Sequence, residues 1–195
     1  MPILSPIQQV AKVGDVAELT RLHRSGSTLD STVCDIAVIN GHLDCIKYAH
    51  EHGCPFSRNI VSYAAMYGHL DCLQYVWEHG GTHTNSHQLI MHCAMGGSLE
   101  CLRFLFDKGV EMRTNDILVL QSIVNQEKCF DCFAFLYHHI AEKNPETIKE
   151  FWRTVNVHAT TFNKIDFDDS RWRKVLFDEE LISIIQAKKQ EVMFI

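Results

Sequence analysis

The chain has 195 residues, with 18 Lys and Arg against 24 Asp and Glu, a net charge of −6, and 46% apolar residues. This balance is typical of a globular protein with one domain, or one domain and an appendage, and it excludes a disordered chain. No apolar stretch approaches the roughly 18 residues of a membrane span, and the start of the chain lacks the features of a signal peptide. Lys and Arg do not cluster as they do in surfaces that bind nucleic acid. We therefore expect an intracellular protein without membrane or nucleic-acid partners.

One short motif recurs along the chain, and its best-preserved copies read Gly-His-Leu-Asp-Cys. Four copies begin at Gly14, Gly41, Gly68 and Gly97, and a degraded fifth begins at Lys128. The copies start 27, 27, 29 and 31 residues apart. A period of this size indicates a solenoid built by stacking one supersecondary unit.

Each copy predicts two short helices. An acidic residue in the first turn and a Gly just past the end are helix start and stop signals, and they predict the second helix of each pair. These second helices are expected at 43–52, 70–79 and 99–108. The first helices are expected at 32–40, 59–67 and 88–96, each close to a Gly that permits a tight turn. The sequence therefore predicts an all-α solenoid of four to five short helix pairs.

After about residue 140 the repeat gives way to three expected helices, which begin near Pro145, Ser170 and Asp178. The last repeat of a solenoid exposes an apolar face, so these helices are most simply a cap. The predicted organisation is a repeat solenoid over 1–139 and a C-terminal helical cap or extension over 140–195.

The repeats resemble those of the ankyrin family. Residues 59–70, Asn-Ile-Val-Ser-Tyr-Ala-Ala-Met-Tyr-Gly-His-Leu, are similar to the family's inner-helix signature. Residues 41–56 resemble more narrowly the short repeats, about 27 residues long, of amoebae, oomycetes and giant viruses. The resemblance implies a non-catalytic protein-interaction module or assembly subunit, which binds a protein partner through a concave surface of inner helices and turns.

The resemblance also implies which residues contact the partner, because the family uses the turns and the last two inner-helix residues before the Gly. The corresponding residues here are Ile39, Asn40, Phe56, Arg58, Met66, Tyr67, Asn85 and Met95. Met and Tyr are enriched in interface cores, although the same side chains could instead pack on their own loops. Residues 1–137 hold nine Lys and Arg against 14 acidic residues, which favours a basic or apolar partner.

Eight Cys and 12 His raise the question of disulfides or a metal site. Four cysteines share one repeat position, and stacked repeats would hold them about 8–10 Å apart, too far for a disulfide or a shared zinc ion. These are Cys45, Cys72, Cys101 and Cys132. We expect them to be buried like small apolar residues, as we do Cys34 and Cys93, and we place Cys54 in a turn.

Two groupings outside this pattern are weaker candidates for metal or thiol chemistry. One is the cluster of His83, His87, His92 and Cys93, and the other is the pair Cys129 and Cys132. The cluster falls on a polar turn, and the pair has neither a second Cys-x-x-Cys nor a βαβ context. We therefore predict no metal and no cofactor. His42 and His69 share a position where the family's His usually makes a turn-stabilising hydrogen bond.

No phosphate-binding, nucleophile-elbow or metalloprotease motif is present, so we expect no catalytic residues and no small-molecule substrate. Two alternative functions remain open. Phe177–Ile185 faintly resembles the start of an F-box, which would make the protein a substrate adaptor for a ubiquitin ligase. A metal- or thiol-dependent enzyme is the other alternative.

Overall fold

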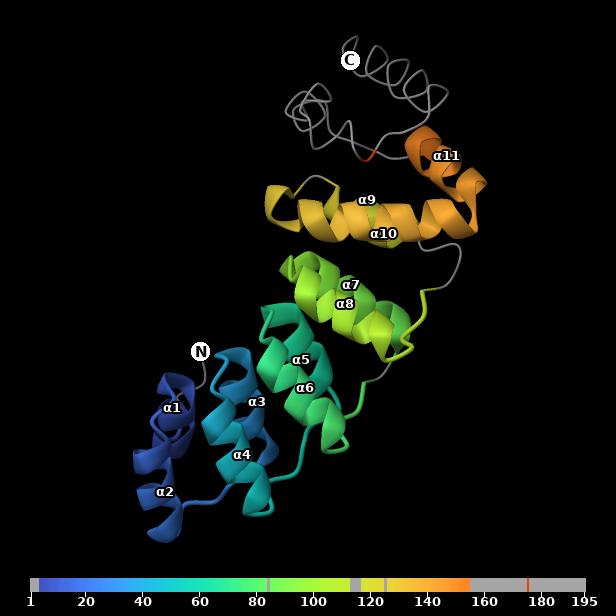
Figure 1. Ribbon diagram of the computed structural model, residues 1–195. Coiled ribbons are helices and arrows are strands. Elements are labelled where there is room, and N and C mark those ends of the chain that lie inside the picture. Colours follow the sequence, from blue (N-terminus) through green and yellow to red (C-terminus); the bar gives the residue numbers. More distant parts are fainter. Residues whose placement is uncertain (1–3, 84, 113–116, 125, 155–174, 176–195) are drawn as a thin grey trace. The chain divides into compact units, whose positions relative to one another are not determined.

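The structure is a computed structural model that describes residues 4–83, 85–112, 117–124, 126–154 and 175 (Figure 1). Within these ranges the chain forms helices and turns and contains no β-strand. The chain divides into two compact units, Met1–Glu111 and Met112–Ile195. No helix in the described part of the chain is both long and apolar enough to cross a membrane.

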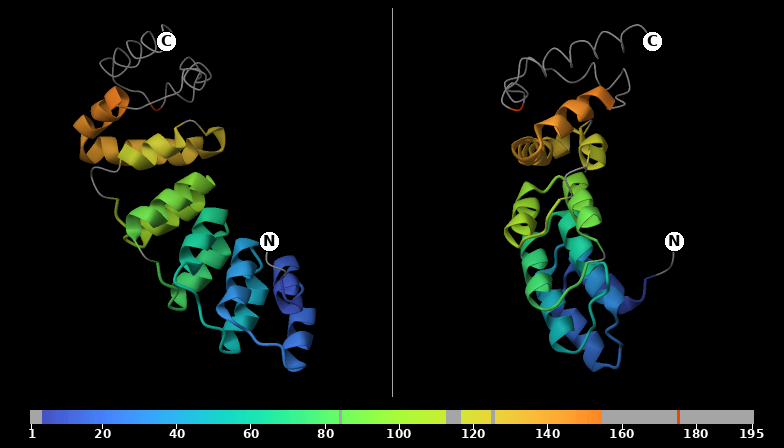
Figure 2. Two further views of the ribbon diagram at one scale, coloured as in Figure 1. Left: turned by 180° about the vertical axis from the view of Figure 1, so that it is seen from behind. Right: turned by 90° about the vertical axis from the view of Figure 1, so that its right-hand side faces the viewer.

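The first unit consists of four helix pairs that follow one another along the chain. They are α1 (Pro6–Val13) with α2 (Val16–Arg24), α3 (Ser31–Ile39) with α4 (Leu43–Glu51), α5 (Ile60–Tyr67) with α6 (Leu70–Glu78), and α7 (Ser86–Gly96) with α8 (Leu99–Asp107). The first helices contact each other in the order α1, α3, α5, α7, and the second helices in the order α2, α4, α6, α8 (Figure 2). The unit is thus a two-layer stack of inner and outer helices.

Local sequence signals begin and end these helices. Asp30 accepts hydrogen bonds from the backbone N–H groups of Thr32 and Val33 at the start of α3, and Asp15 accepts one from Glu18 at the start of α2. The turn between the two helices of a pair needs a left-handed residue, and Gly41 supplies it with a φ of 75°. Each inner helix is therefore followed at once by its outer helix.

The core of the first unit repeats with the sequence. Leu19, Ile46, Leu73 and Leu102 occupy one repeat position and are fully buried. Directly before the last three of them stand Cys45, Cys72 and Cys101, which are also buried, as predicted. Small residues such as Ala64 and Ala94 on the inner helices let neighbouring helices approach closely. Packing between successive pairs, rather than one central cluster, stabilises the stack.

The second unit is described as α9 (Ile117–Ile123), a 3₁₀ turn (Glu127–Cys129), α10 (Phe130–Lys143) and α11 (Pro145–Thr154). Phe130 occupies the repeat position of Leu43, so α9 and α10 form the fifth pair by register. α10 continues without a break across the expected boundary at 139/140, and the extent of the cap stays a prediction. The helices expected from Ser170 and Asp178 lie outside the described residues.

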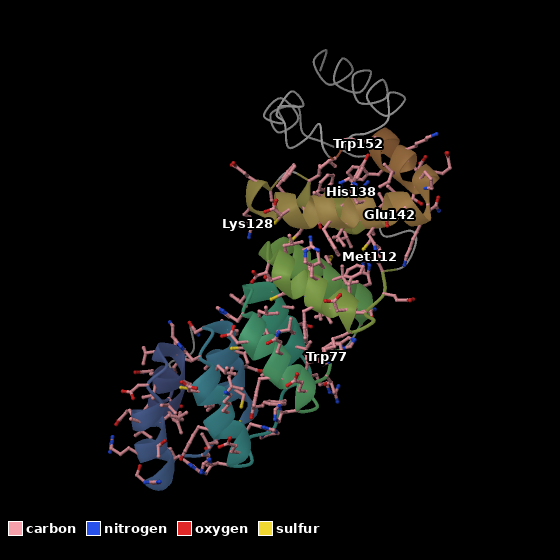
Figure 3. The ribbon with its side chains drawn as sticks, viewed as in Figure 1. Trp77, Met112, Lys128, His138, Glu142 and Trp152 are labelled. Carbon is pink, nitrogen blue, oxygen red and sulfur yellow. The ribbon has the colours of Figure 1, made fainter. Side chains whose placement is uncertain are left out.

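The core of the second unit is aromatic. Phe133, Phe151 and Trp152 are almost completely buried, and Trp152 lies where α11 meets α10 (Figure 3). The ring centroids of Phe133 and Phe151 are 6.0 Å apart. Trp152 Nε1 donates a hydrogen bond to the Tyr137 hydroxyl at 3.3 Å. Cys129 and Cys132 are buried in this unit, consistent with a packing role for the pair.

Candidate protein-binding surface

Large apolar side chains are exposed at two adjacent repeat positions in the last turn of the inner helices. Val13 is 71% exposed at the end of α1, and Met66 and Tyr67 are 39% and 50% exposed at the end of α5. In repeat register, Val13 corresponds to Asn40 and Tyr67. Exposed apolar residues that gather at two adjacent register positions, rather than scatter, mark a candidate interaction surface.

We define the inner-helix strip as the last-turn residues Val13, Ile39, Asn40, Met66, Tyr67 and Met95. Ile39, Asn40 and Met95 are half-buried within it. The Asn40 side-chain amide donates a hydrogen bond to the Ile36 carbonyl at 2.7 Å, so this residue also closes its own helix. The sequence prediction did not include Val13, although its register with Tyr67 was a signal that could have identified it.

The three other predicted contact residues lie in the loops that lead into the inner helices. Arg58 is exposed, whereas the half-buried Phe56 ring stacks on His50 with centroids 4.4 Å apart. Asn85 accepts a hydrogen bond from the His87 backbone at 2.8 Å and caps α7. An inner helix of eight residues, such as α5, is about 12 Å long, so the loop residues are separated from the strip by a helix length.

Histidines join successive repeats directly beside the strip. His42 Nε2 lies 3.0 Å from the Lys12 carbonyl oxygen, and His69 Nε2 lies 3.1 Å from that of Ile39. A carbonyl oxygen can only accept a hydrogen bond, so Nε2 carries the proton in both histidine rings. The hydrogen bond expected for these residues is formed, but its acceptor belongs to the preceding repeat. Each imidazole also packs on the preceding junction Gly, where a Cβ would collide with the ring.

The fourth repeat departs from this arrangement. Ser98 replaces the His, and its side chain lies against Gly68, where it also caps α8 by accepting a hydrogen bond from the Cys101 backbone. Gly96 packs so closely on α5 that a Cβ there would collide with the Met66 carbonyl oxygen. A smaller residue at 98 and no side chain at 96 together bring α7 close to α5 at the strip.

A second set of histidines connects the outer helices. The Tyr48 hydroxyl lies 3.0 Å from His23 Nδ1, and the Tyr75 hydroxyl lies 3.1 Å from His50 Nδ1. Tyr75 also stacks on His79, with ring centroids 4.0 Å apart. These histidines are therefore structural members of the stack.

The metal candidates show no ligand arrangement. The His83 ring stacks on Trp77, which is labelled in Figure 3, with centroids 5.6 Å apart. Among the residues that the structure describes, no three His, Cys, Asp or Glu side chains gather in a way that could hold a metal ion.

Most of the cysteines are in environments that suppress thiol reactivity. All eight are buried, and burial raises the pKa of Cys45 to about 11 and of Cys72 to about 12. A protonated thiol is a poor nucleophile and a poor metal ligand. One pair is different and was not predicted: the Sγ atoms of Cys34 and Cys54 lie 2.9 Å apart.

Comparison with known proteins agrees with this geometry. Residues 34–116 match the family model described as ankyrin repeats (3 copies). The crystal structure of the human ASB11 ankyrin repeat domain resembles the fold with a TM-score of 0.56 and 17% sequence identity, over 72% of this chain and 70% of that chain. No curated protein matches the sequence significantly.

Residues 34–116 thus match a model of ankyrin repeats, and the all-α solenoid of helix pairs predicted from the sequence is confirmed. The narrower resemblance to the short repeats of amoebae, oomycetes and giant viruses stays a prediction.

Proposed function

We propose that the repeats form a non-catalytic protein-binding module whose partner docks on the inner-helix strip. The observation that carries this proposal is the exposure of Val13, Met66 and Tyr67 at two adjacent register positions at the ends of the inner helices. Desolvating such side chains against a partner is favourable, and Met and Tyr are common in interface cores. Ankyrin repeats, as a family, are interaction modules, which supports the same function.

The charge of the repeats suits a basic or apolar partner surface. Residues 1–137 carry nine basic against 14 acidic residues, a net charge of −5. A partner of opposite sign is attracted at long range, and an apolar patch on it would cover the strip. An intracellular location and the absence of nucleic-acid, membrane and small-molecule partners stay predictions.

The two alternative functions gain no support from the described residues. Phe177–Ile185, on which a ubiquitin-ligase adaptor role depends, lies outside them. For a metal- or thiol-dependent enzyme, the described part of the chain contains no cluster of ligands for a metal ion, and the thiol-dependent form stays a prediction that nothing here tests.

A photo-crosslinking residue at position 67 should identify the partner. In the native source, we expect it to capture one protein that the same residue at position 118 does not capture. Leu118, on α9, is the matched control because it is 66% exposed and lies outside the strip. The proposal would be wrong if both positions captured the same proteins.

With the purified partner, Tyr67→Ala and Met66→Ala should each weaken binding about tenfold or more, because truncating a central aromatic or Met anchor removes its buried contact. Titration calorimetry measures this loss, and Leu118→Ala should bind like the unmodified chain. The melting temperature should change little, since half of the Tyr67 side chain is already exposed. A large fall in melting temperature would assign these residues to the core instead.

A further inference from the structure

Two cysteines from different elements of the second repeat meet inside the first unit. Cys34 lies on the inner helix α3, and Cys54 lies in the turn that follows the outer helix α4. Their Sγ atoms are 2.9 Å apart, about 0.9 Å more than the length of a disulfide bond, roughly 2.05 Å. A small movement of the turn would bring the two sulfurs to bonding distance.

The two thiols form a short hydrogen-bond chain. The Cys34 thiol donates to Cys54 Sγ, and the Cys54 thiol donates to the Asp30 carbonyl oxygen at 3.0 Å. The hydrogen bond from Cys34 lowers the pKa of Cys54, and the same contact together with burial raises the pKa of Cys34. The pair is therefore asymmetric: Cys54 ionises first, and Cys34 keeps its proton.

We propose that Cys34 and Cys54 are a redox-active thiol pair, which hydrogen peroxide converts into a disulfide between α3 and the turn after α4. The Cys54 thiolate sulfur attacks one peroxide oxygen, the O–O bond breaks, and the leaving hydroxide takes up a proton to form water. Cys54 is then a sulfenic acid. The Cys34 sulfur attacks the Cys54 sulfur and loses its proton, the S–O bond breaks, and a second water leaves. Two electrons pass from the thiols to the peroxide.

Position along the chain distinguishes this pair from the other thiols. Cys54 stands between exposed residues, Gly53 and Pro55, in a turn, so a local opening of that turn admits a small oxidant. Cys45 and Cys72 lie inside outer helices, and burial raises the pKa of both thiols. Peroxide should therefore select the Cys34 and Cys54 pair among the eight cysteines.

The direct test is peptide mapping of the full chain after treatment with hydrogen peroxide. We expect a non-reducing digest to contain the Cys34 and Cys54 peptides joined, with the mass lowered by two hydrogens, and reductant to separate them. The proposal is overturned if this pair stays reduced while other cysteines oxidise, or if the cross-links join other residues. This measurement needs no variant and does not depend on the protein partner.

Two variants test the assigned order. In Cys34→Ser, the Cys54 sulfenic acid has no resolving thiol, so Cys54 should progress to sulfinic acid; in Cys54→Ser, Cys34 should remain a thiol. Cys72→Ala is the matched control, because it removes a buried thiol and leaves the pair intact. Equal oxidation of Cys34 and Cys54 in the two serine variants would refute the order, and circular dichroism shows that each variant is folded.

A melting experiment provides a second readout. The disulfide would close a chain segment that contains the whole of α4, which restricts the unfolded state. We expect the melting temperature of the peroxide-treated chain to rise by roughly 5–10 °C and to return on reduction. Cys54→Ser should show no rise under the same treatment, and a rise of equal size there would contradict the assignment.

Discussion

A thiol fills the space between helix layers at positions 45, 72 and 101. Each stands directly before a fully buried Leu or Ile on an outer helix. A Cys side chain occupies little more space than Ala and packs like a small apolar group. Unlike a methyl group, however, it carries a proton that can be lost at alkaline pH, and this makes the stack sensitive to base.

Stability should fall above about pH 9 because of these thiols. Burial raises the pKa of Cys45 to about 11 and of Cys72 to about 12, so the folded state keeps both protons while the unfolded chain loses them. Their stabilising contribution is complete below the unfolded-state pKa and is lost as the pH rises toward these values. Each thiol should reduce the free energy of unfolding by up to about 1.4 kcal/mol per pH unit.

Urea unfolding at about pH 8 and about pH 10.5, with a reductant present, measures this effect. Tyr and Lys also titrate in this range, so the informative quantity is the difference between the unmodified chain and Cys45→Ala. The variant should show the smaller decrease in stability with pH. If both chains lost stability equally, Cys45 would not be the cause.

At the level of elements, the contact between α5 and α7 depends on the absence of a side chain. Ala is a better helix former than Gly by about 1 kcal/mol, so helix propensity favours Gly96→Ala. The new Cβ would instead collide with the Met66 carbonyl oxygen, which is backbone and cannot move by a rotamer change. The close approach of the two helices therefore decides the sign of the effect.

We expect Gly96→Ala to destabilise the chain by about 1–3 kcal/mol, the usual cost of overpacking. Equilibrium urea unfolding measures this change. Gly80→Ala serves for comparison, because Gly80 has a φ of 83° but open space around it, so only backbone strain contributes there. A Gly96→Ala variant more stable than the parent would show that α7 does not rest on α5 at this point.

The helix pairs could be predicted because their signals are local. Asp44 in the first turn and Gly53 past the end predict an outer helix at 43–52, and α4 spans Leu43–Glu51. No bounds were predicted for α9, because the fifth copy lacks the Gly that separates the helices of other pairs. Whether a helix can be predicted from the sequence thus depends on its capping residues, and the prediction fails where those residues are missing.

Contacts between repeats were harder to predict from the sequence. The hydrogen bond from His69 to the Ile39 carbonyl spans 30 residues, and no pattern within one repeat specifies its acceptor. Cys34 and Cys54 do not occupy the same repeat position, so the argument from repeat spacing, which places Cys45, Cys72 and Cys101 too far apart for a disulfide, did not apply to them. The strip was predicted in part, but the distance between Arg58 and Tyr67 along an inner helix became visible only in the structure.

At the scale of the whole molecule, the two compact units have cores of different character. The first relies on small and aliphatic residues that repeat with the sequence, whereas the second gathers large rings around Phe151. Phe151 lies 4.9 Å from Trp152 between ring centroids and is fully buried. A change at Phe151 should therefore act within its own unit.

Phe151→Ala should cost the second unit about 3–5 kcal/mol, because it leaves a cavity among packed rings. Hydrogen exchange measured by mass spectrometry should show faster exchange of the α10 and α11 amides, while those of α1 to α4 keep their protection. Leu118→Ala, at an exposed position of the same unit, should leave both regions unchanged. Equal loss of protection in α3 and α4 would mean that the chain unfolds as one cooperative body.

The histidine contacts indicate where a further repeat could be inserted into the stack. His42 and His69 each engage the carbonyl and the junction Gly of the preceding repeat, so a duplicate of the second repeat placed before the third would find a matching neighbour on both sides. The fourth repeat instead meets the third through Ser98, which lies against Gly68, and through Gly96, which packs on the Met66 backbone. Lengthening the array by copying in its N-terminal half would therefore preserve the histidine contacts between repeats.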